Sequence, residues 1–204
     1  MKEPTLYYVY DPMCSWCWGY RNTWLKLSDA LQGKVLVNYQ LGGLAPDSDV
    51  AMPIELQTSL QGIWRNIHQK LGTEFNFDFW TQCTPQRSTY PSCRACLIAR
   101  EEGKEIEMLF AIQQAYYLQA KNPSLQETLI KLAGDIGLNV DEFTSKLNAT
   151  EINRKFEEEI ASSRQLPIQG FPSLVLEVDG QFKPIQLDYL DWEKTYTEIL
   201  TYIN

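Results

Sequence analysis

The sequence predicts an α/β fold in which strands near the two ends of the chain form one sheet, interrupted by an all-helical insertion. Three observations support this. A β-prone run at residues 6–10 is followed by a Cys-x-x-Cys segment and helical periodicity. Helical patterns then fill most of residues 46–165, and two further strand-like runs flank a tight-turn signal near residue 180. This order indicates one interrupted sheet rather than two consecutive domains.

The N-terminal part has the pattern of a βαβ unit. Residues 6–10 are an apolar, β-prone run, and residues 35–41 alternate as a second strand that Gly42-Gly43 ends. Between them apolar side chains recur at helical spacing up to Gly33, which we expect to be a left-handed cap: Tyr20, Trp24, Leu27 and Leu31. Short links between strand, helix and strand predict parallel strands with a right-handed connection.

The middle of the chain is predicted to be helical. We expect helices to begin at Pro53, Pro91, about Lys104, Ser124, Asn139 and Thr150. Ser124 with Glu127 has the spacing of a capping box, Asn139 with Glu142 looks like another helix start, and Thr150 is a cap candidate. Residues 72–89 fit no single pattern. We therefore predict a sheet-containing domain of residues 1–45 and 148–204, and a helical insertion of residues 46–147.

The C-terminal part predicts a hairpin and a closing helix. Residues 173–178 have the composition of a strand, and Asp179-Gly180 is a tight-turn signal. The returning strand, predicted at residues 182–187, contains Pro184, which favours an edge position. A last helix is expected over residues 189–202.

Composition excludes several classes of function. The chain has 204 residues, of which 44% are apolar and 22% charged, as in an ordinary globular protein. A net charge of −8 argues against nucleic acid or an anionic membrane surface as a partner. The first strand begins too early to leave room for a signal region, and no stretch is long enough to span a bilayer, so we expect a cytoplasmic protein. Five cysteines in that setting suggest catalysis, metal binding or burial rather than a disulfide framework.

The segment Cys14-Ser15-Trp16-Cys17 lies between the first strand and the first helix. At a helix start, unpaired backbone N–H groups and the positive end of the helix dipole favour a thiolate at Cys14. Cys17 lies one turn further on, within reach to close a disulfide or to resolve a mixed one. We therefore interpret Cys14 and Cys17 as a catalytic redox pair. Two small buried residues, or half of a zinc site, are the alternatives.

The predicted order of elements is that of a thioredoxin fold, with the dithiol after the first strand of its core. A second prediction follows from this topology, because Pro172 comes just before the third strand. We expect the Phe171–Pro172 bond to be cis and to lie beside the thiols, leaving the backbone polar groups of Phe171 free for a substrate strand. An ordinary trans proline at an edge strand is the alternative.

Three segments resemble the DsbA-like thioredoxin superfamily, and its cytoplasmic FrnE-like branch in particular. They are residues 11–19 around the dithiol, Leu41-Gly42-Gly43-Leu44, and Gly170-Phe171-Pro172-Ser173. Residues 111–117 in the helical block look like the same branch. The resemblance implies thiol–disulfide oxidoreductase activity, with Cys14 as the attacking cysteine, Cys17 as the resolving one and Pro172 as the cis proline.

The chain departs from this family at one position. Many of its members carry a carboxylate six residues before the first cysteine, which takes the proton of the buried thiol. Tyr8 holds that position here, and Asp11 is either a substitute or, by its place before Pro12, a turn residue.

The remaining cysteines and the single histidine are interpreted as structural. Cys93 and Cys96 share a helix face with Leu97, which favours packed thiols over a second redox pair or a Cys₄ zinc site. Cys83 is expected to pack, and His68 to lie on a solvated helix face. We expect neither a metal nor a cofactor.

Aromatic residues around the thiols suggest how a substrate docks. Trp16 lies between the two cysteines, Trp18 follows them and Phe171 precedes the proline, so these side chains either form an apolar docking surface or pack the core. We predict substrate contacts from Trp16, Phe171 and Pro172. The expected partners are protein or small-molecule disulfides, including glutathione, and the oligomeric state is not predicted.

Two other functions fit the same fold. A glutathione-dependent transferase or isomerase of the kappa-class type usually has serine at the position of Cys14 and lacks the pair, so the dithiol speaks against it. A non-catalytic binding or chaperone module would use the helical block instead. In a reducing cytoplasm the resting dithiol would favour reduction or isomerisation of disulfides over their formation.

Overall fold

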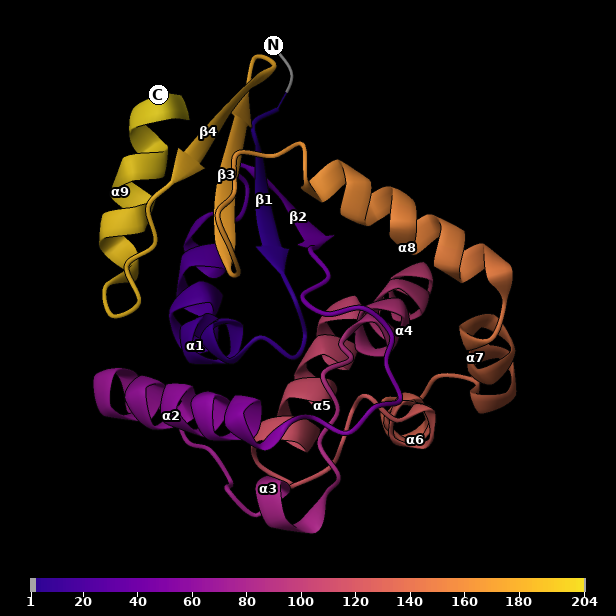
Figure 1. Ribbon diagram of the computed structural model, residues 1–204. Helices are drawn as coiled ribbons and strands as arrows, with labels where there is room; N and C mark the ends of the chain where they lie inside the picture. Colours follow the sequence, from indigo (N-terminus) through magenta and orange to yellow (C-terminus); the bar gives the residue numbers. More distant parts are fainter. Residues whose placement is uncertain (1–2, 204) are drawn as a thin grey trace.

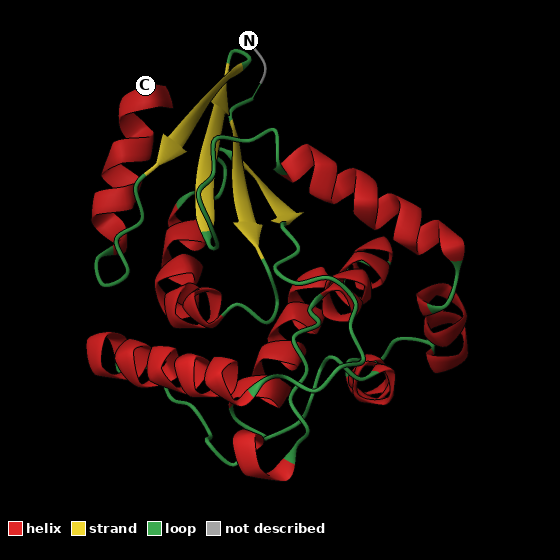
Figure 2. Ribbon diagram, viewed as in Figure 1, coloured by secondary structure: helices red, strands yellow, loops and turns green. Residues whose placement is uncertain are grey.

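The computed structural model describes residues 3–203 and has the predicted α/β fold. A twisted four-stranded sheet lies in the upper central part of the view in Figures 1 and 2, with helices on both sides of it and below it. Its strands are β1 (Thr5–Tyr10), β2 (Leu36–Leu41), β3 (Ser173–Val178) and β4 (Gln181–Ile185). The sheet order is β2-β1-β3-β4, so strands from the two ends of the chain are neighbours.

The register of the sheet is that of an interrupted thioredoxin fold. β1 runs parallel to β2, with Thr5 opposite Leu36 and Tyr10 opposite Leu41. β3 pairs antiparallel to β1, and β4 pairs antiparallel to β3 at the edge, where Pro184 needs no ladder N–H. The hairpin turn between β3 and β4 has positive φ at both Asp179 and Gly180, as a type I′ turn requires. The predicted fold class is therefore confirmed.

Three helices complete the sheet-containing part. α1 (Ser15–Ala30) connects β1 to β2, α8 (Thr150–Ser163) packs beside β2, and α9 (Trp192–Ile203) packs on α1, β3 and β4. In Figure 1, α1 and α9 lie to one side of the sheet and α8 to the other.

The helical block follows β2 in the chain. It contains α2 (Ile54–Leu71), the short α3 (Phe79–Gln82), α4 (Tyr90–Glu101), α5 (Glu105–Tyr117), α6 (Gln126–Asp135) and α7 (Val140–Leu147). These helices gather below the sheet in the view of Figure 1. α4 and α5 pack against each other, and α2 packs against α1, so the block reaches the helix that carries the dithiol.

Two predicted N-caps, Ser124 and Thr150, are wrong, and for Ser124 the reason is a tertiary contact of its side chain. Ser124 does not cap α6, since its hydroxyl donates to the carbonyl of Ser88. Thr150 is the first residue of α8 and makes no cap hydrogen bond. Asn139 caps α7 as predicted, accepting from the N–H groups of Asp141 and Glu142. Gly33 has a positive φ of 71°, but it lies beyond the last helical residue, Ala30.

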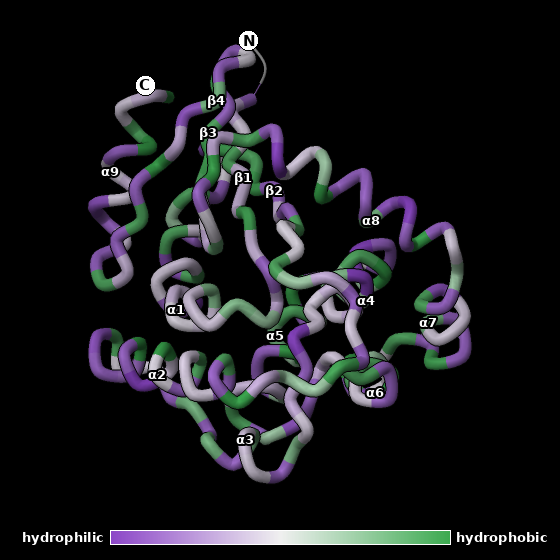
Figure 3. Tube along the Cα trace, in the orientation of Figure 1, coloured by the Kyte–Doolittle hydropathy of each residue, from purple (hydrophilic) through white to green (hydrophobic). Residues whose placement is uncertain are grey.

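One continuous core joins the sheet to the helical block. Its largest fully buried side chains include Trp64 of α2, Tyr8 and Tyr10 of β1, and Tyr117 of α5. Figure 3 shows hydrophobic residues on the central strands and helices, whereas α8 and the outer end of α2 are mostly hydrophilic. Within residues 3–203 no helix is both long and apolar enough to cross a membrane.

Candidate active site

The dithiol lies where the sheet meets α1. β1 ends at Tyr10, the chain turns at residues 11–13, and Cys14 is the N-cap of α1 with extended backbone angles (φ −78°, ψ 118°). The N–H of Cys14 donates to the carbonyl of Asp11 at 3.1 Å, which fixes the turn. Cys14 makes no side-chain cap hydrogen bond, so its sulfur is not used to hold the helix start. This is the placement predicted to favour a thiolate.

The two sulfurs of the pair differ in environment. Both cysteines are reduced; Cys14 is 7% exposed and Cys17 only 1%. Burial raises the pKa of Cys17 well above its usual value, and so does the hydrogen bond between Cys17 and Cys14. Cys17 therefore keeps its proton, and Cys14 is the more accessible sulfur of the pair.

The loop before β3 contacts the first of these sulfurs. The Phe171–Pro172 peptide bond is cis, and the Cys14 Sγ donates to the carbonyl oxygen of Phe171 at 3.3 Å. Phe171 is half-buried, whereas Pro172 is buried behind it. The structure thus brings Cys14, Cys17, Phe171 and Pro172 together from opposite ends of the chain.

A groove opens beside Cys14. It has a volume of about 290 Å³, and Cys14, Trp16 and Phe171 line it at the dithiol end. The opposite wall comes from the helical block and was not predicted: Met52, Leu60, Ile63, Gln86, Arg87, Thr89 and Tyr116. Pro172 does not line this groove. Arg87 is its one charged lining residue; it is exposed and has no ion-pair partner among the described residues.

The two tryptophans have different roles. Trp16 is half-buried in the groove wall, with its ring edge-on to Tyr189 at 5.2 Å and the Lys70 ammonium 5.9 Å from its ring centre. Trp18 instead stacks on Tyr117 and donates its indole N–H to the carbonyl of Glu74. Of the two aromatic side chains considered for docking, Trp16 therefore lies in the groove beside Cys14, while Trp18 packs.

Asp11 is a buried anchor rather than a free base. Its Oδ1 accepts the N–H of Met13, and its Oδ2 accepts the N–H of Leu44, the Thr89 hydroxyl and the Cys93 thiol. This side chain is 0% exposed, and burial raises its pKa. Asp11 thus ties together the dithiol turn, the loop after β2 and the start of α4. Its four donors could not be foreseen, because three of them lie between 33 and 82 residues away in the sequence.

Tyr8 stands six residues before Cys14, where many members of the DsbA-like family have a carboxylate, and its ring is part of an aromatic stack. Tyr8 is 2% exposed and stacks on Trp24 with ring centres 4.2 Å apart. Burial, followed by the nearby Cys17, raises the pKa of Tyr8 well above its usual value. Tyr8 therefore keeps its proton at neutral pH and cannot replace the carboxylate as a base.

The other cysteines and His68 lie where they were predicted to pack or face solvent. Cys93 and Cys96 are 0% exposed within α4, and burial raises the pKa of both, which favours packed, protonated thiols over a thiolate. Cys83 is half-buried and donates to the carbonyl of Ala120. His68 is exposed, with Nδ1 2.9 Å from the carbonyl of Thr73. Within residues 3–203 no group of three or more histidine, cysteine, aspartate or glutamate side chains is placed to hold a metal ion.

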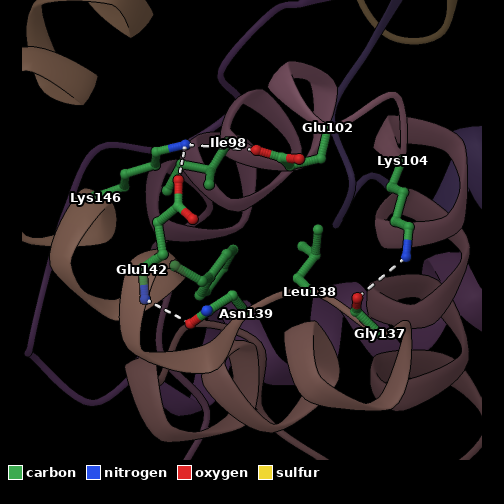
Figure 4. A pocket seen from close by; sticks show the side chains of 9 residues that line it. Ile98, Glu102, Lys104, Gly137, Leu138, Asn139, Glu142 and Lys146 are labelled. Carbon is green, nitrogen blue, oxygen red and sulfur yellow. Dashed lines mark hydrogen bonds and ion pairs between the residues drawn. The ribbon is translucent and has the colours of Figure 1, made fainter.

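A second pocket, shown in Figure 4, lies between α4 and α7, away from the dithiol. Its charged groups are already engaged. Lys104 donates to the carbonyls of Ile136 and Gly137 beyond α6, and Lys146 pairs with Glu142 at 2.8 Å and Glu102 at 3.8 Å. We interpret these contacts as helix capping and surface ion pairing, not as a ligand site.

Gly42 is expected to be essential for the position of Phe171. A Cβ at Gly42 would overlap the Phe171 ring, so Gly42→Ala must displace the loop that contacts Cys14. We expect a loss of about 1–3 kcal/mol in the free energy of unfolding, measured in urea, together with slower thiol exchange. The matched control is Gly62→Ala in α2, where a Cβ meets nothing within 4 Å. That variant should gain about 1 kcal/mol, and equal effects at the two positions would contradict the argument.

The fold and the dithiol define a thioredoxin-fold protein with a helical insertion. The sequence profile of a family described as "Thioredoxin" matches residues 7–181, so the chain belongs to this thioredoxin family.

Two solved structures are similar over nearly the whole chain. A Nitrosomonas europaea protein, described only provisionally as a protein disulfide isomerase, is 26% identical with a TM-score of 0.86, covering 98% of each chain. DsbM, a cytosolic disulfide reductase of Pseudomonas aeruginosa, is 26% identical with a TM-score of 0.78, over 97% of this chain and 98% of that one. These matches agree with the DsbA-like resemblance.

Curated relatives carry a different kind of name. The ClpXP adapter protein SpxH of Bacillus subtilis is 22% identical over 98% of this chain and 69% of its own length. SpxH of Halalkalibacterium halodurans is 20% identical over 88% of this chain. The match covers only 60% of that relative.

Proposed function

We propose that the protein is a thiol–disulfide oxidoreductase in which Cys14 attacks and Cys17 resolves. The observation that carries the proposal is the Cys14 sulfur at the start of α1, bordering the groove and hydrogen-bonded to the Phe171 carbonyl. At this position the Cys14 sulfur is accessible to a substrate disulfide, and the buried Cys17 lies one helical turn away, within reach of a mixed disulfide on Cys14.

The reaction has two exchange steps. The Cys14 thiolate attacks one substrate sulfur, forming a mixed disulfide and releasing the other substrate sulfur as a thiolate. Cys17 then loses its proton and attacks the Cys14 sulfur, so that the Cys14–Cys17 disulfide forms and the second substrate sulfur leaves. The pair is oxidised by two electrons and the substrate disulfide is reduced. Two thiol molecules, or one dithiol, then reduce the Cys14–Cys17 disulfide in two further exchanges, become oxidised to a disulfide themselves and return the pair to its starting state.

Glutathione is the substrate that the groove favours. A groove of about 290 Å³ next to the sulfur admits a small peptide thiol, and exposed Arg87 offers a free cation to a carboxylate in a chain of net charge −8. The similar protein DsbM has been solved with GSH, which supports this choice. Reduction is the proposed direction, as expected for a dithiol in a reducing, cytosolic setting like that of DsbM.

Trapping the intermediate tests the proposal. We expect Cys17→Ser to accumulate a mixed disulfide between Cys14 and glutathione when the variant is mixed with glutathione disulfide, detected by intact mass spectrometry. In the Cys17→Ser variant, the additional substitution Arg87→Gln should slow the formation of the adduct with glutathione. It should not slow the formation of an adduct with an uncharged disulfide such as N,N′-diacetylcystamine. The control is Arg65→Gln, since Arg65 lies on α2 over the Phe77 ring and outside the groove. An adduct on any cysteine other than Cys14 would reject the proposal.

An adapter role is the second candidate, favoured by the name of the curated relatives. In that case the surface around the groove would bind a protein partner without exchange, in line with the binding module considered from the sequence. The alternative of a glutathione-dependent isomerase is supported by the fold alone. A structure of 2-hydroxychromene-2-carboxylate isomerase has a TM-score of 0.65 but is only 10% identical to this chain. Dependence of activity on Cys14 separates exchange from a purely adapter role.

A further inference from the structure

The two thiols of the pair open onto different sides of α1. Cys14 borders the substrate groove and Cys17 does not. Cys17 instead borders a separate cavity of about 30 Å³ between α1, α5 and the sheet, which Cys14 does not line. Leu25 and Ile106, both exposed, lie at its rim, so the cavity reaches the surface away from the groove.

Two buried polar side chains in this cavity lack a protein partner. Gln113 of α5 is 2% exposed, and we find no hydrogen bond from its side-chain amide to any described residue. Tyr8, whose residue is also 2% exposed, has no hydrogen bond from its hydroxyl to a described residue either. Buried polar groups are nearly always satisfied, by protein or by ordered water. A cavity of about 30 Å³ exceeds the roughly 10–15 Å³ that one water requires, and it offers that water several polar partners.

No side chain near Cys17 is placed to act as its base. The titratable and charged groups facing this thiol come from every element around it: Cys14 and Arg21 from α1, Tyr8 and Asp11 from β1 and the turn after it, Tyr39 from β2, Tyr117 from α5, and Tyr189 from the segment before α9. The four tyrosines have raised pKa values because of burial. Asp11 is occupied by its four donors, and Arg21 is a cation stacked 3.7 Å over the Phe110 ring.

We propose that Gln113 and Tyr8 hold a water molecule that takes the proton of Cys17 during resolution, on the opposite side of α1 from the substrate. The inference rests on the proposed function. In the mixed disulfide, the Cys17 S–H bond breaks and its proton passes to this water and out to solvent. The electron pair left on sulfur forms the bond to Cys14, the bond between Cys14 and the substrate breaks, and the substrate sulfur leaves as a thiolate. Gln113 acts through the water and is therefore a positioning residue.

The two steps can be timed separately in one experiment. The full-length reduced protein, with Cys83→Ser to remove the remaining half-buried thiol, is mixed with an aromatic disulfide that releases a coloured thiol. Attack by Cys14 releases the first equivalent, and resolution by Cys17 releases the second. We expect Gln113→Leu to leave the first phase within about twofold, and to slow the second at least about tenfold with a changed pH profile.

Control and rescue variants keep the test decisive. Gln114→Leu makes the same substitution one residue on, outside the cavity, and should change neither phase. Gln113→Glu retains a group that binds water and should restore the second phase. Tyr8→Phe removes one hydroxyl, keeps the stack on Trp24 and should also slow only the second phase. Unchanged resolution in Gln113→Leu and Tyr8→Phe, or equal slowing of both phases, would overturn the inference, whereas absence of the first phase in the parent protein would overturn the proposed function.

Discussion

Replacing Cys14 with serine is expected to reduce thiol–disulfide exchange to the rate of the uncatalysed reaction. A hydroxyl in the same place remains protonated at neutral pH, so no anion is available to attack the substrate sulfur. Cys17 cannot take over, because it is 1% exposed, has a raised pKa and does not border the groove. The measurement is the reduction of glutathione disulfide at saturating substrate.

The same substitution should leave the fold intact or stabilise it. Cys14 occupies the N-cap of α1 without a side-chain cap hydrogen bond, and serine is among the preferred residues there. We expect the free energy of unfolding to stay equal or to rise by up to about 1 kcal/mol. Lost activity with retained stability therefore identifies chemistry at the sulfur, and Cys83→Ser, remote from the groove, is the control that should retain activity. Turnover that survives in Cys14→Ser would leave the adapter role as the better candidate.

The local features of this chain were predictable, because each has a short sequence signal. Alternation of apolar and polar residues predicted strands, and the place of the dithiol between a strand and a helix predicted that Cys14 lies at a helix start. The hairpin at Asp179-Gly180 was predicted from two residues, and both have the positive φ expected. The predicted topology also indicated that the loop with Pro172, just before β3, would lie beside the thiols with a cis Phe171–Pro172 bond.

Contacts distant in the sequence were not predictable. The wall of the groove around Arg87 comes from the helical block, and no periodic pattern links it to the dithiol. Ser124 had the spacing of a capping box with Glu127, but its hydroxyl donates a hydrogen bond to the carbonyl of Ser88 instead. Gln113 belongs to an apolar helix face, so the role proposed for it rests on the cavity beside Cys17 and not on a sequence signal.

Asp11 is where local and distant contacts meet, and its removal should have the largest effect on stability. The turn signal Asp11-Pro12 was recognised in the sequence, but the carboxylate also binds the N–H of Leu44 and the Thr89 hydroxyl. Asp11→Ala leaves two buried N–H groups and that hydroxyl without their acceptor. We expect a loss of about 3–5 kcal/mol in the free energy of unfolding, a large part of the stability of a typical domain.

The pH dependence of that loss has a definite sign. Because burial raises the pKa of Asp11, the folded state holds its proton more tightly than the unfolded state does. The contribution of Asp11 to stability is therefore greatest below the unfolded pKa, near 3.8, and it falls as pH rises through the folded pKa. Asp11→Asn keeps the shape of the side chain and removes this titration, so its stability should vary less with pH.

Urea unfolding followed by tryptophan fluorescence between about pH 4 and about pH 7 measures both effects. The matched control is Asp135→Ala, which removes an aspartate that is 51% exposed and paired with the exposed Lys131 at 2.9 Å. Such a surface pair contributes about 0–1 kcal/mol, so this control should remain close to the parent protein. If Asp11→Ala cost no more than Asp135→Ala, the buried carboxylate would not be what holds the Cys14 turn against the helical block, and the position of Cys14 would need another explanation.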